Sequence, residues 1–503
     1  MYRVFRVQKD CYITDRVIKG KRRYNSNTGK AATLDLFKLY GVTKSGSFDN
    51  NELSRALLKF DIDKLQEDFD NNKINITSNF KAYLKLFDAY GGQTTPNNFS
   101  LTLYPLSKSF EEGIGKDVVY YQDNDICNFL TSSKNNYWNV SGANAKGTLG
   151  ASNIDVIQSG NLGNGLIPLW YNQYFEKGDE NLFLDITTCI SGVLKGLIPN
   201  HGFRLSYSEE LENDTETRFV KRFFSSETTT PEKRPQLIIK YDDSTNSNQQ
   251  SFVFDYTGSL FLYNKVRNTL KNIISSSQQI TGSNCLKLKL QTEISGGFYA
   301  LNYSASQYQY FNNYIEGAYT SSFSVPSSDS TIYQKIIQSG SVDFTPIWYS
   351  NDGTLGYVTG STIRISMPKR DGEYPTVKDY FVSVMNTKEE YDVDDVEQFR
   401  VHIFNNNEPY IKMAKSPIVT PSYIPEYVYY SIRDSKTNKI VIDFDDTYQS
   451  TRLSSDSTSL WFELYMDSLL EGNLYEIDIM IKENNKKYYF RNVSQKFKIK
   501  ASK

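Results

Sequence analysis

Apolar and polar residues alternate along most of this chain in short runs. In residues 81–86 the apolar side chains Ala82, Leu84 and Leu86 share one face, and residues 285–290 alternate in the same way. Because successive side chains of a strand point to opposite faces, a period of two predicts half-buried strands. Turns rich in Gly, Asn and Ser separate the runs, which favours antiparallel sandwiches over βαβ units. The sequence therefore predicts an all-β protein.

Two segments depart from this alternation. Residues 187–194 predict a short helix, with Thr187 or Thr188 as its N-cap and Gly196 at its end. Residues 263–274 carry apolar side chains at helical spacing, although a strand is an alternative there. Helices are thus expected to be minor elements of the fold.

The polar tract at residues 242–250 predicts a linker after the first large domain. We expect an N-terminal jelly-roll-like β-sandwich followed by two or three smaller, Ig-like β-sandwiches. The expected domains are residues 1–242 for the N-terminal sandwich, 243–350 for a β-rich domain, and 351–420 and 421–503 for two Ig-like sandwiches.

The order of the strand signals in residues 1–242 resembles that of the DNRLRE family of jelly-roll domains. The segments that carry the resemblance are residues 10–15, 24–25 with Gly29, 34–40, 54–62, 80–87, 110–117, 183–187, 201–206, 222–227 and 234–241. Phe110 stands where the family often has Trp, and the loop after residue 122 is long. The family occurs in secreted polysaccharide-binding proteins and in virion proteins of tailed bacteriophages, so the resemblance implies one of these settings.

Charge and hydropathy narrow the classes of partner. Lys and Arg number 56 against 58 Asp and Glu, a formal net charge of −2 that gives no electrostatic reason to expect nucleic acid. Aromatic residues reach 14% and mean hydropathy is −0.52. Residues 1–10 lack the apolar core of a signal peptide, and no run is long enough to span a membrane. We expect synthesis in a cytoplasm and no membrane partner.

Cysteine and histidine give little sign of chemistry. The four cysteines are far apart and lack the spacing of a metal site, which predicts buried free thiols: Cys11, Cys127, Cys189 and Cys285. His201 and His402 are the two histidines, which disfavours histidine-based catalysis and histidine-rich metal sites. We predict no cofactor and no metal.

Acidic and glycine-rich segments are further candidates for functional sites. Residues 110–117 contain three carboxylates, but a glycosidase needs two of them across a sugar, and the resemblance implies a structural turn here. The acidic runs 392–397 and 443–446 do not match an EF-hand loop. Residues 160–165 lack the Lys-Ser/Thr of a phosphate-binding loop. We therefore predict that the chain is not an enzyme.

Aromatic side chains are the strongest candidates for a binding site. Tyr137, Trp138, Trp170 and Tyr171 lie in or beside the long loop region at residues 122–168. Exposed aromatic rings anchor protein partners and stack on sugar faces. These four residues are the predicted interface or glycan-contacting residues, with packing into the domain's own core as the alternative.

The resemblance and the missing enzyme motifs together predict a structural component of a tailed bacteriophage virion. It would act in the neck or collar, with the tail, or as a head decoration, after synthesis in the host cytoplasm. Its partners would be other virion proteins and copies of itself, with host surface polysaccharide as a further candidate. The alternative function is a carbohydrate-binding adhesin that recognises host surface glycans. A polysaccharide-degrading enzyme is a third hypothesis, for which the sequence shows no specific carboxylate pair.

Overall fold

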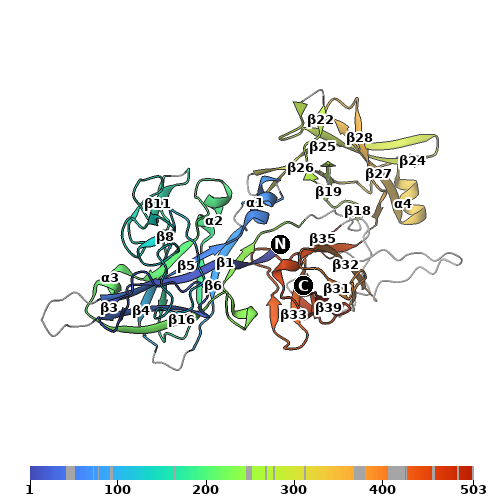
Figure 1. Ribbon diagram of the computed structural model, residues 1–503. Coiled ribbons are helices and arrows are strands. Elements are labelled where there is room, and N and C mark those ends of the chain that lie inside the picture. Colours follow the sequence, from blue (N-terminus) through green and yellow to red (C-terminus); the bar gives the residue numbers. More distant parts are fainter. Residues whose placement is uncertain are drawn as a thin grey trace.

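The computed structural model contains three β-rich units (Figure 1). Its described residues are 1–40, 51–71, 73–76, 79–90, 95–163, 165–244, 252–266, 269–275, 278–310, 313–367, 380–405, 425, 427–455, 459–483 and 486–500. Strands prevail in these residues, and their α-helices are at most 8 residues long. The predicted all-β class is confirmed, with a large N-terminal β-sandwich followed by two smaller ones.

The N-terminal unit is built on a 10-stranded antiparallel sheet in the order β13-β7-β15-β5-β1-β17-β6-β14, with β4 paired to β5 and β16 paired to β4. Its strands are β1 (Tyr2–Thr14), β2 (Val17–Ile18), β3 (Lys21–Arg22), β4 (Thr33–Tyr40), β5 (Asn51–Phe60), β6 (Lys81–Leu86), β7 (Phe99–Pro105), β8 (Thr131–Ser133), β9 (Asn136–Tyr137), β10 (Lys146–Thr148), β11 (Val156–Asn161), β12 (Leu166–Pro168), β13 (Tyr171–Phe175), β14 (Leu182–Asp185), β15 (Phe203–Tyr207), β16 (Arg218–Phe224) and β17 (Gln236–Lys240). Its helices are α1 (Asp63–Asp70), α2 (Thr187–Leu194) and α3 (Glu209–Asn213), with a 3-10 turn at Pro231–Lys233.

Strand β1 joins the two layers of this unit because it pairs with two partners. Tyr2–Arg6 pair with β17, and the strand pairs with β5 from Val7 onward. The two ends of the strand order, β13 and β14, are joined by Gln173. Its side-chain amide donates to the Asn181 carbonyl at 2.8 Å and accepts from the Phe183 amide at 2.7 Å. One side chain thus replaces a strand pairing and closes the sandwich.

The main core fills the space between the layers with side chains from alternate strand positions. Ala82, Leu84 and Leu86 are fully buried, as the alternation in residues 81–86 predicts. Phe99 and Phe175 stack with ring centroids 4.9 Å apart. Burial of such side chains is the dominant favourable term in the folding of the unit.

A second, smaller core lies on the opposite face of β1, β5 and β7. Ala56 and Leu58 belong to the main core, so Leu57 between them faces the other way. Residues 107–163, which we name the loop layer, cover that face. The minor core consists of Cys11, Ile13, Leu57, Tyr104, Leu106, Phe110, Cys127, Phe129, Trp138, Ala143 and Val156. The long loop predicted from sequence is therefore a packed layer of the N-terminal unit.

The middle unit is a sheet in the order β18-β29-β27-β24-β25-β26-β19, with β28 paired to β27. Its elements are β18 (Phe252–Val253), β19 (Gly258–Tyr263), β20 (Lys265–Val266), β21 (Thr269–Leu270), β22 (Ile274–Ser275), β23 (Gln278–Gln279), β24 (Leu286–Ile294), β25 (Gly297–Tyr310), β26 (Asn313–Phe323), α4 (Tyr333–Ser339), β27 (Ser341–Ser350), β28 (Gly356–Thr359) and β29 (Ile363–Ser366). Its first and last strands, β18 and β29, pair in parallel. The chain therefore enters and leaves this unit at one place.

The C-terminal unit packs two sheets, β30-β32-β36-β35 and β31-β39-β37-β33-β34, with β38 paired to β37. Its strands are β30 (Tyr380–Val384), β31 (Glu390–Tyr391), β32 (Val396–Asn405), β33 (Tyr427–Asp434), β34 (Ile440–Ile442), β35 (Ser454–Ser455), β36 (Leu460–Tyr465), β37 (Leu474–Glu483), β38 (Lys486–Phe490) and β39 (Phe497–Ile499), with a 3-10 turn at Met466–Ser468. Tyr430 and Phe462 stack between the sheets with centroids 4.1 Å apart.

These pairings place the last domains differently from the expected ranges 351–420 and 421–503. Strand β29 pairs with β27, so residues 363–366 belong to the middle unit. Strand β32 pairs with β36, so strands from both expected ranges share one sheet. The described residues 380–500 form one sandwich instead of two. Pairing between strands far apart in sequence leaves no local signal, so the pattern of alternation alone did not reveal it.

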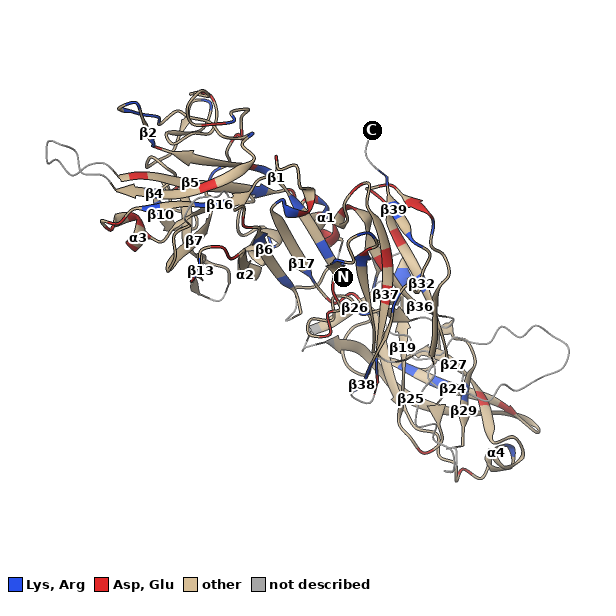
Figure 2. Ribbon diagram, turned by 90° about the horizontal axis from the view of Figure 1, so that it is seen from below, with Lys and Arg blue, Asp and Glu red and all other residues tan. Residues whose placement is uncertain are grey.

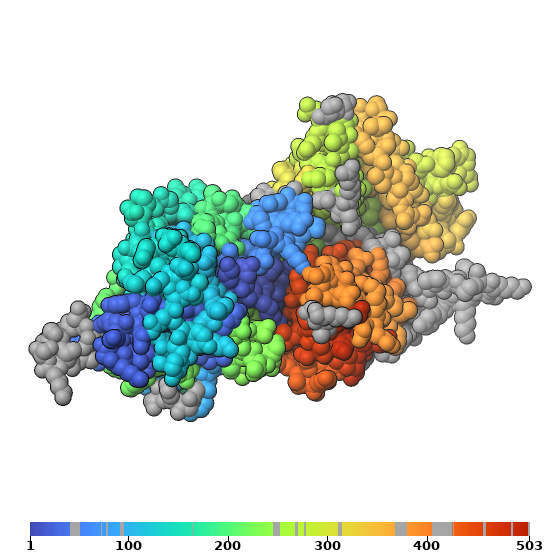
Figure 3. Space-filling view, in the orientation of Figure 1, coloured from blue at the N-terminus to red at the C-terminus, as the bar shows by residue number. Residues whose placement is uncertain are grey.

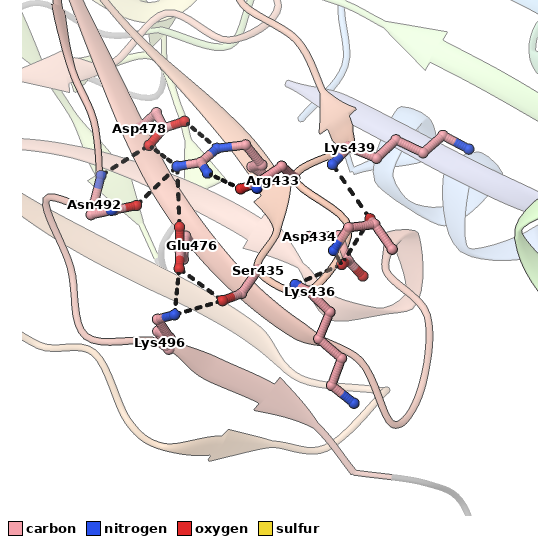
Figure 4. A network of polar contacts seen from close by, with 11 residues as sticks. Arg433, Asp434, Ser435, Lys436, Lys439, Glu476, Asp478, Asn492 and Lys496 are labelled. Atoms are coloured by element: carbon pink, nitrogen blue, oxygen red, sulfur yellow. Dashed lines mark hydrogen bonds and ion pairs between the residues drawn. The ribbon is translucent and has the colours of Figure 1, made fainter.

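A buried polar network crosses β33 and β37 on the face opposite the core (Figure 4). Arg433 donates to both carboxylate oxygens of Asp478, at 2.9 and 3.0 Å, and lies 3.1 Å from Glu476. Asn438 and Asn492 accept the remaining guanidinium hydrogen bonds. The hydrogen bonds that Arg433 donates to Asp478, and the negative charges of Asp478 and Glu476, raise the pKa of Arg433.

The N- and C-terminal units meet at a buried joint centred on Arg3, whose residue surface is 0% exposed. Arg3 Nη1 donates to the Asp68 carboxylate at 2.9 Å, and its guanidinium lies 3.8 Å from the ring centroid of Tyr465. The Tyr465 hydroxyl donates to the same carboxylate at 3.2 Å. The Val4 amide donates to Ser468 Oγ at 3.1 Å. A cation stacked on an aromatic ring and paired with a carboxylate thus links the first strand to the last unit.

A second contact lies on β6 and β17. Lys240 is 3.3 Å from the Asp445 carboxylate, and the ammonium groups of Lys240 and Lys81 lie 5.8 and 5.6 Å from the ring centroid of Tyr448. In Figure 2 the C-terminal unit lies between the other two and the molecule is elongated, and Figure 3 shows the C-terminal unit beside the N-terminal unit with the middle unit above it.

The predicted helix at residues 187–194 is confirmed as α2. Its N-cap residue is Ile186, and neither predicted threonine caps it. Asp185 accepts a hydrogen bond from the Thr187 amide at 3.0 Å instead. Gly196 follows the helix with a φ of 69°, a left-handed conformation that glycine adopts at no steric cost.

The helical interpretation of residues 263–274 is wrong. Strands β20 and β21 form a short hairpin there. Val266 is 52% exposed while Ile273 is buried, so the apolar residues at helical spacing do not share one face. The alternative that the sequence left open, a strand, is the one observed.

Candidate interaction surface

The Asn27 side chain holds three loop segments of the N-terminal unit together. Its Nδ2 donates to the carbonyls of Glu112 at 2.7 Å and Cys127 at 2.9 Å. Its Oδ1 accepts from the amides of Gly115 at 2.6 Å and Gly29 at 3.3 Å. Every hydrogen-bonding position of this buried amide is thus used, which fixes the backbone around it.

Two positions that contact the Asn27 side chain, residues 29 and 115, have no room for any residue other than glycine. A Cβ on Gly115 would lie 2.1 Å from the Asn27 carbonyl oxygen, and one on Gly29 would lie 2.3 Å from the Glu112 carbonyl oxygen. Gly113 has a φ of 79°. Residues 110–117 are therefore a structural turn in which backbones approach closely, as the resemblance implied.

A group of exposed apolar side chains lies on the segments that Asn27 and its neighbours fix. We name it the tyrosine cap, and it consists of Tyr24, Ile114, Val119, Tyr120 and Tyr121. Their exposed fractions are 38%, 76%, 39%, 83% and 39%. Large apolar side chains at such exposure, gathered on adjoining segments, are typical of surfaces that contact another molecule.

Hydrogen bonds order the backbone that carries the cap. Asp117 Oδ1 accepts from the amides of Val119 and Tyr120, both at 2.7 Å. The Asn27 amide donates to the Tyr121 carbonyl at 3.0 Å, and Ser26 Oγ donates to the Val118 carbonyl at 2.8 Å. The tyrosines therefore stand on a backbone that is ordered before any partner arrives.

A carboxylate cluster around the buried Asp10 adjoins the turn at residues 110–117. Asp10 accepts from the amide and hydroxyl of Ser226, at 2.8 and 2.6 Å, and its own amide donates to Glu112 at 2.8 Å. Lys30 bridges Glu112 at 3.2 Å and Glu227 at 2.7 Å. Burial raises the pKa of Asp10 to about 7, against the hydrogen bonds from Ser226.

The loop layer is organised by Asp155, which is fully buried. Its carboxylate accepts from the backbone amides of Asn139 at 2.7 Å, Val140 at 2.9 Å and Ala145 at 3.0 Å. Such bonds replace the strand pairing that a loop lacks. The layer thereby presents fixed side chains on its outer side.

The predicted site residues divide into two pairs that are not one surface. Trp138 is 4% exposed in the minor core, and its Nε1 donates to the Asn128 carbonyl at 3.0 Å. Tyr171 packs against the main core, and its hydroxyl accepts from the Cys189 amide at 3.0 Å. Trp138 is thus a packing residue, which excludes it from stacking on a ligand.

The other two predicted residues are exposed. Tyr137 is 66% exposed on β9, and Trp170 is 45% exposed just before β13. Lys108 donates to the Tyr137 carbonyl at 3.1 Å, so the backbone at this tyrosine is also held. Both rings are available to a partner.

The tyrosine cap was not predicted from sequence. Residues 118–121, Val-Val-Tyr-Tyr, directly follow the turn that the resemblance marked as structural. The one sequence feature that could have indicated the cap is this run of four apolar or aromatic residues after a turn, which shows no alternation with polar residues. It does not by itself distinguish an exposed loop from a strand.

Four thiols were predicted to be buried and free. All four are free, and Cys11, Cys127 and Cys189 are buried while Cys285 is half-buried.

The acidic run 443–446 serves contacts inside the protein, since Asp445 accepts from Ser450 Oγ at 2.5 Å. Within the described ranges, no group of three or more His, Cys, Asp or Glu side chains is placed to hold a metal ion.

A cleft of about 440 Å³ lies beside the joint of the N- and C-terminal units. Helix α1 contributes Lys64 and Asp68 to its wall, and the C-terminal unit contributes Asp394 and Asp467. Lys64 pairs with Asp394 at 2.8 Å.

In the part of the chain that the structure describes, no helix is both long and apolar enough to cross a membrane.

Comparison with known proteins gives only distant structural likenesses. No protein-family model matches the sequence. No curated protein matches it either. Among solved structures, the fibronectin(III)-like modules of Clostridium thermocellum CbhA share 8% identity over 51% of this chain and 90% of theirs, with a TM-score of 0.14. Titin-A168169 shares 10% over 51% of this chain and 95% of its own, with a TM-score of 0.15.

A third likeness is to a tetra-tandem repeat in the extending region of a large adhesion protein. It shares 11% identity over 42% of this chain and 43% of that chain, with a TM-score of 0.14. At these identities and scores the likenesses carry no argument about function.

Proposed function

We propose that this chain is a non-catalytic structural component of a tailed bacteriophage virion, in the neck or collar, with the tail, or decorating the head. The order of strand signals in residues 1–242 supports a virion setting through the resemblance described above. The observation that carries a role in assembly is the tyrosine cap. Tyr120 is 83% exposed on a backbone fixed by Asp117.

Rigid exposed tyrosines are suited to contacts between subunits. An aromatic side chain has few rotatable bonds, so little conformational entropy is lost when a partner covers it. A backbone ordered in advance lowers the cost further. The partners of this surface would be other virion proteins and copies of the chain itself.

The carboxylates nearest the cap support a non-catalytic role. Glu112 accepts from the Asp10 amide and from Lys30, and Asp117 accepts from two backbone amides. These groups hold the turn in place. The structural use of both carboxylates agrees with the role that the resemblance implied for residues 110–117.

The proposal is tested in the phage that encodes the chain, by replacing Tyr120 and Tyr121 with Ala together. Purified particles should contain the wild-type protein, as mass spectrometry would show, and should lose it in the double variant. Tyr90→Ala is the matched control, because Tyr90 is 79% exposed outside the cap. Absence of the wild-type chain from particles would sink the proposal, and unchanged incorporation of the double variant would remove the cap from it.

The second candidate function is a carbohydrate-binding adhesin. Exposed rings at Tyr137 and Trp170 favour it, since aromatic faces stack on sugars. Binding of purified protein to host surface polysaccharide should then fall at least tenfold in Tyr137→Ala or Trp170→Ala. Silence on a glycan array, with unaltered adsorption of both variants, would dismiss this function. Trp138→Ala is unsuitable as a test because it would disturb the minor core.

A further inference from the structure

The minor core contains two thiols that come from different layers of the N-terminal unit. Cys11 lies on β1 and is 0% exposed, and Cys127 lies in the loop layer and is 1% exposed. Both are free in the structure. The functions proposed above make no use of either.

Backbone contacts on both sides of Cys11 reach the segments around Cys127. On one side, the Asp10 amide donates to the Glu112 carboxylate at 2.8 Å. On the other, the Tyr12 amide donates to Thr28 Oγ1 at 3.0 Å. Cys11 is therefore held between the turn at Glu112 and the segment at Thr28.

Cys127 is held by the same two segments. Its amide donates to the Glu111 carbonyl at 2.9 Å, and its carbonyl accepts from Asn27 Nδ2 at 2.9 Å. Glu111 and Asn27 are the chain neighbours of the two residues that contact the flanks of Cys11. Both cysteines are thus held by the same turn and segment, and their side chains belong to the same buried core.

The two thiols also interact directly. The pKa of Cys11 is raised well above its usual value, mainly by contact with the Cys127 thiol and to a lesser extent by burial. A raised pKa leaves little thiolate, which is the species that attacks a disulfide. Reaction would therefore be slow in the closed fold and would proceed when the loop layer opens transiently.

We propose that Cys11 and Cys127 are a redox pair that closes to a disulfide in an oxidising medium and fastens the loop layer to β1. The oxidant is a low-molecular-weight disulfide such as oxidised glutathione. One thiolate attacks it, forms a mixed disulfide and releases one glutathione thiol. The second cysteine thiolate then attacks the protein sulfur of that mixed disulfide and releases the second glutathione thiol. The two cysteines lose two protons and two electrons, and the oxidant gains them.

A bond between these residues would close a long loop of chain. Cross-linking restricts the unfolded ensemble and raises stability when native geometry is kept. The tyrosine cap lies on the segments that flank Cys127, so the bond would also hold the cap. We expect the oxidised protein to melt several degrees higher than the reduced protein.

The test uses the full chain, oxidised with a glutathione redox buffer with and without mild denaturant, then alkylated and digested for mass spectrometry. A peptide pair joining Cys11 to Cys127 is expected, lighter than the reduced pair by two hydrogen atoms. Cys127→Ser should abolish it. Serine places a hydroxyl in the core, so Cys127→Ala is measured in parallel and its fold is checked by near-ultraviolet circular dichroism.

Cys189→Ser is the matched control, because Cys189 is also buried but lies in α2 beside the main core. Its Cys11–Cys127 peptide pair should form as in the wild type. Glutathione adducts on Cys11 and Cys127 without a bond between them would overturn the proposal. Their complete alkylation after oxidation under both conditions, or a cross-link from either to Cys189 or Cys285, would do the same.

Discussion

The guanidinium of Arg3 on β1 lies 3.8 Å from the ring centroid of Tyr465 at the end of β36. The first strand of the N-terminal unit therefore contacts the C-terminal unit directly. Arg3 is fully buried in this contact, and the Asp68 carboxylate accepts a hydrogen bond from it. One charged side chain thus couples the two ends of the chain. The middle unit begins and ends with two paired strands, β18 and β29, and contributes no residue to the contact around Arg3 described above.

Replacing Arg3 with Met should destabilise the joint by about 3 kcal/mol, because the buried Asp68 carboxylate loses the guanidinium and keeps only Lys73, at 3.0 Å, and the Tyr465 hydroxyl. Chemical denaturation followed by tyrosine fluorescence would measure the change in the free energy of unfolding. The Lys64–Asp394 pair at the same joint is exposed, so Lys64→Ala should cost less than about 1 kcal/mol. Equal effects of the two variants would contradict a joint centred on Arg3.

The stability of the N-terminal unit should depend on pH through Asp10. Burial raises the pKa of its carboxyl from 3.8 to about 7. The folded state then binds the proton more tightly than the unfolded state, so the free energy of unfolding falls as pH rises through this window. The fall is at most about 4 kcal/mol, complete above the folded pKa.

Asp10→Asn should flatten that slope, because the amide cannot titrate yet can donate to Ser226 Oγ. Urea unfolding at several pH values between 4 and 8 measures it. Asp125→Asn, at an exposed site of the same unit, is the control and should keep the wild-type slope. A slope that survives Asp10→Asn would show that another group titrates.

Trp138 and Tyr137 are neighbours in sequence but should respond oppositely to truncation. Trp138→Ala removes a buried ring from the minor core and should cost about 3–5 kcal/mol. Tyr137→Ala removes an exposed ring and should stay within about 0.5 kcal/mol. Hydrogen exchange in residues 128–145 should accelerate only in the tryptophan variant. The same exchange in both variants would contradict the packing of the loop layer.

The network around Arg433 offers a test within the C-terminal unit. Arg433→Met should lower its stability by about 3–5 kcal/mol, since the buried Asp478 would lose its cation and Glu476 would keep only Lys496. Lys496 contacts Glu476 from an exposed position, so Lys496→Ala should cost about 1 kcal/mol or less. Thermal unfolding of the two variants, compared with the wild type, measures both. A stable Arg433→Met protein would show that the network is dispensable.

Local patterns predicted the strands because each strand side chain reports its own face. Residues 81–86 and the helix at 187–194 were found in this way. Whether Tyr137 or Trp138 is exposed could not be predicted, because it depends on the loop layer folding over a second face of the sheet. The pairing of β32 with β36 likewise joins segments separated by other strands. The tyrosine cap was missed because exposure of an apolar run is decided by the backbone contacts of Asn27, which lie far away in sequence.

The most direct measurement is cryo-electron microscopy of the purified phage particle at a resolution that traces side chains. We expect density for the three β-rich units in the neck, tail or head surface, with Tyr120 and Tyr121 buried against a neighbouring subunit. A particle without this chain would contradict the virion role. A particle in which the chain is present but the tyrosine cap faces solvent would contradict the assembly surface proposed here.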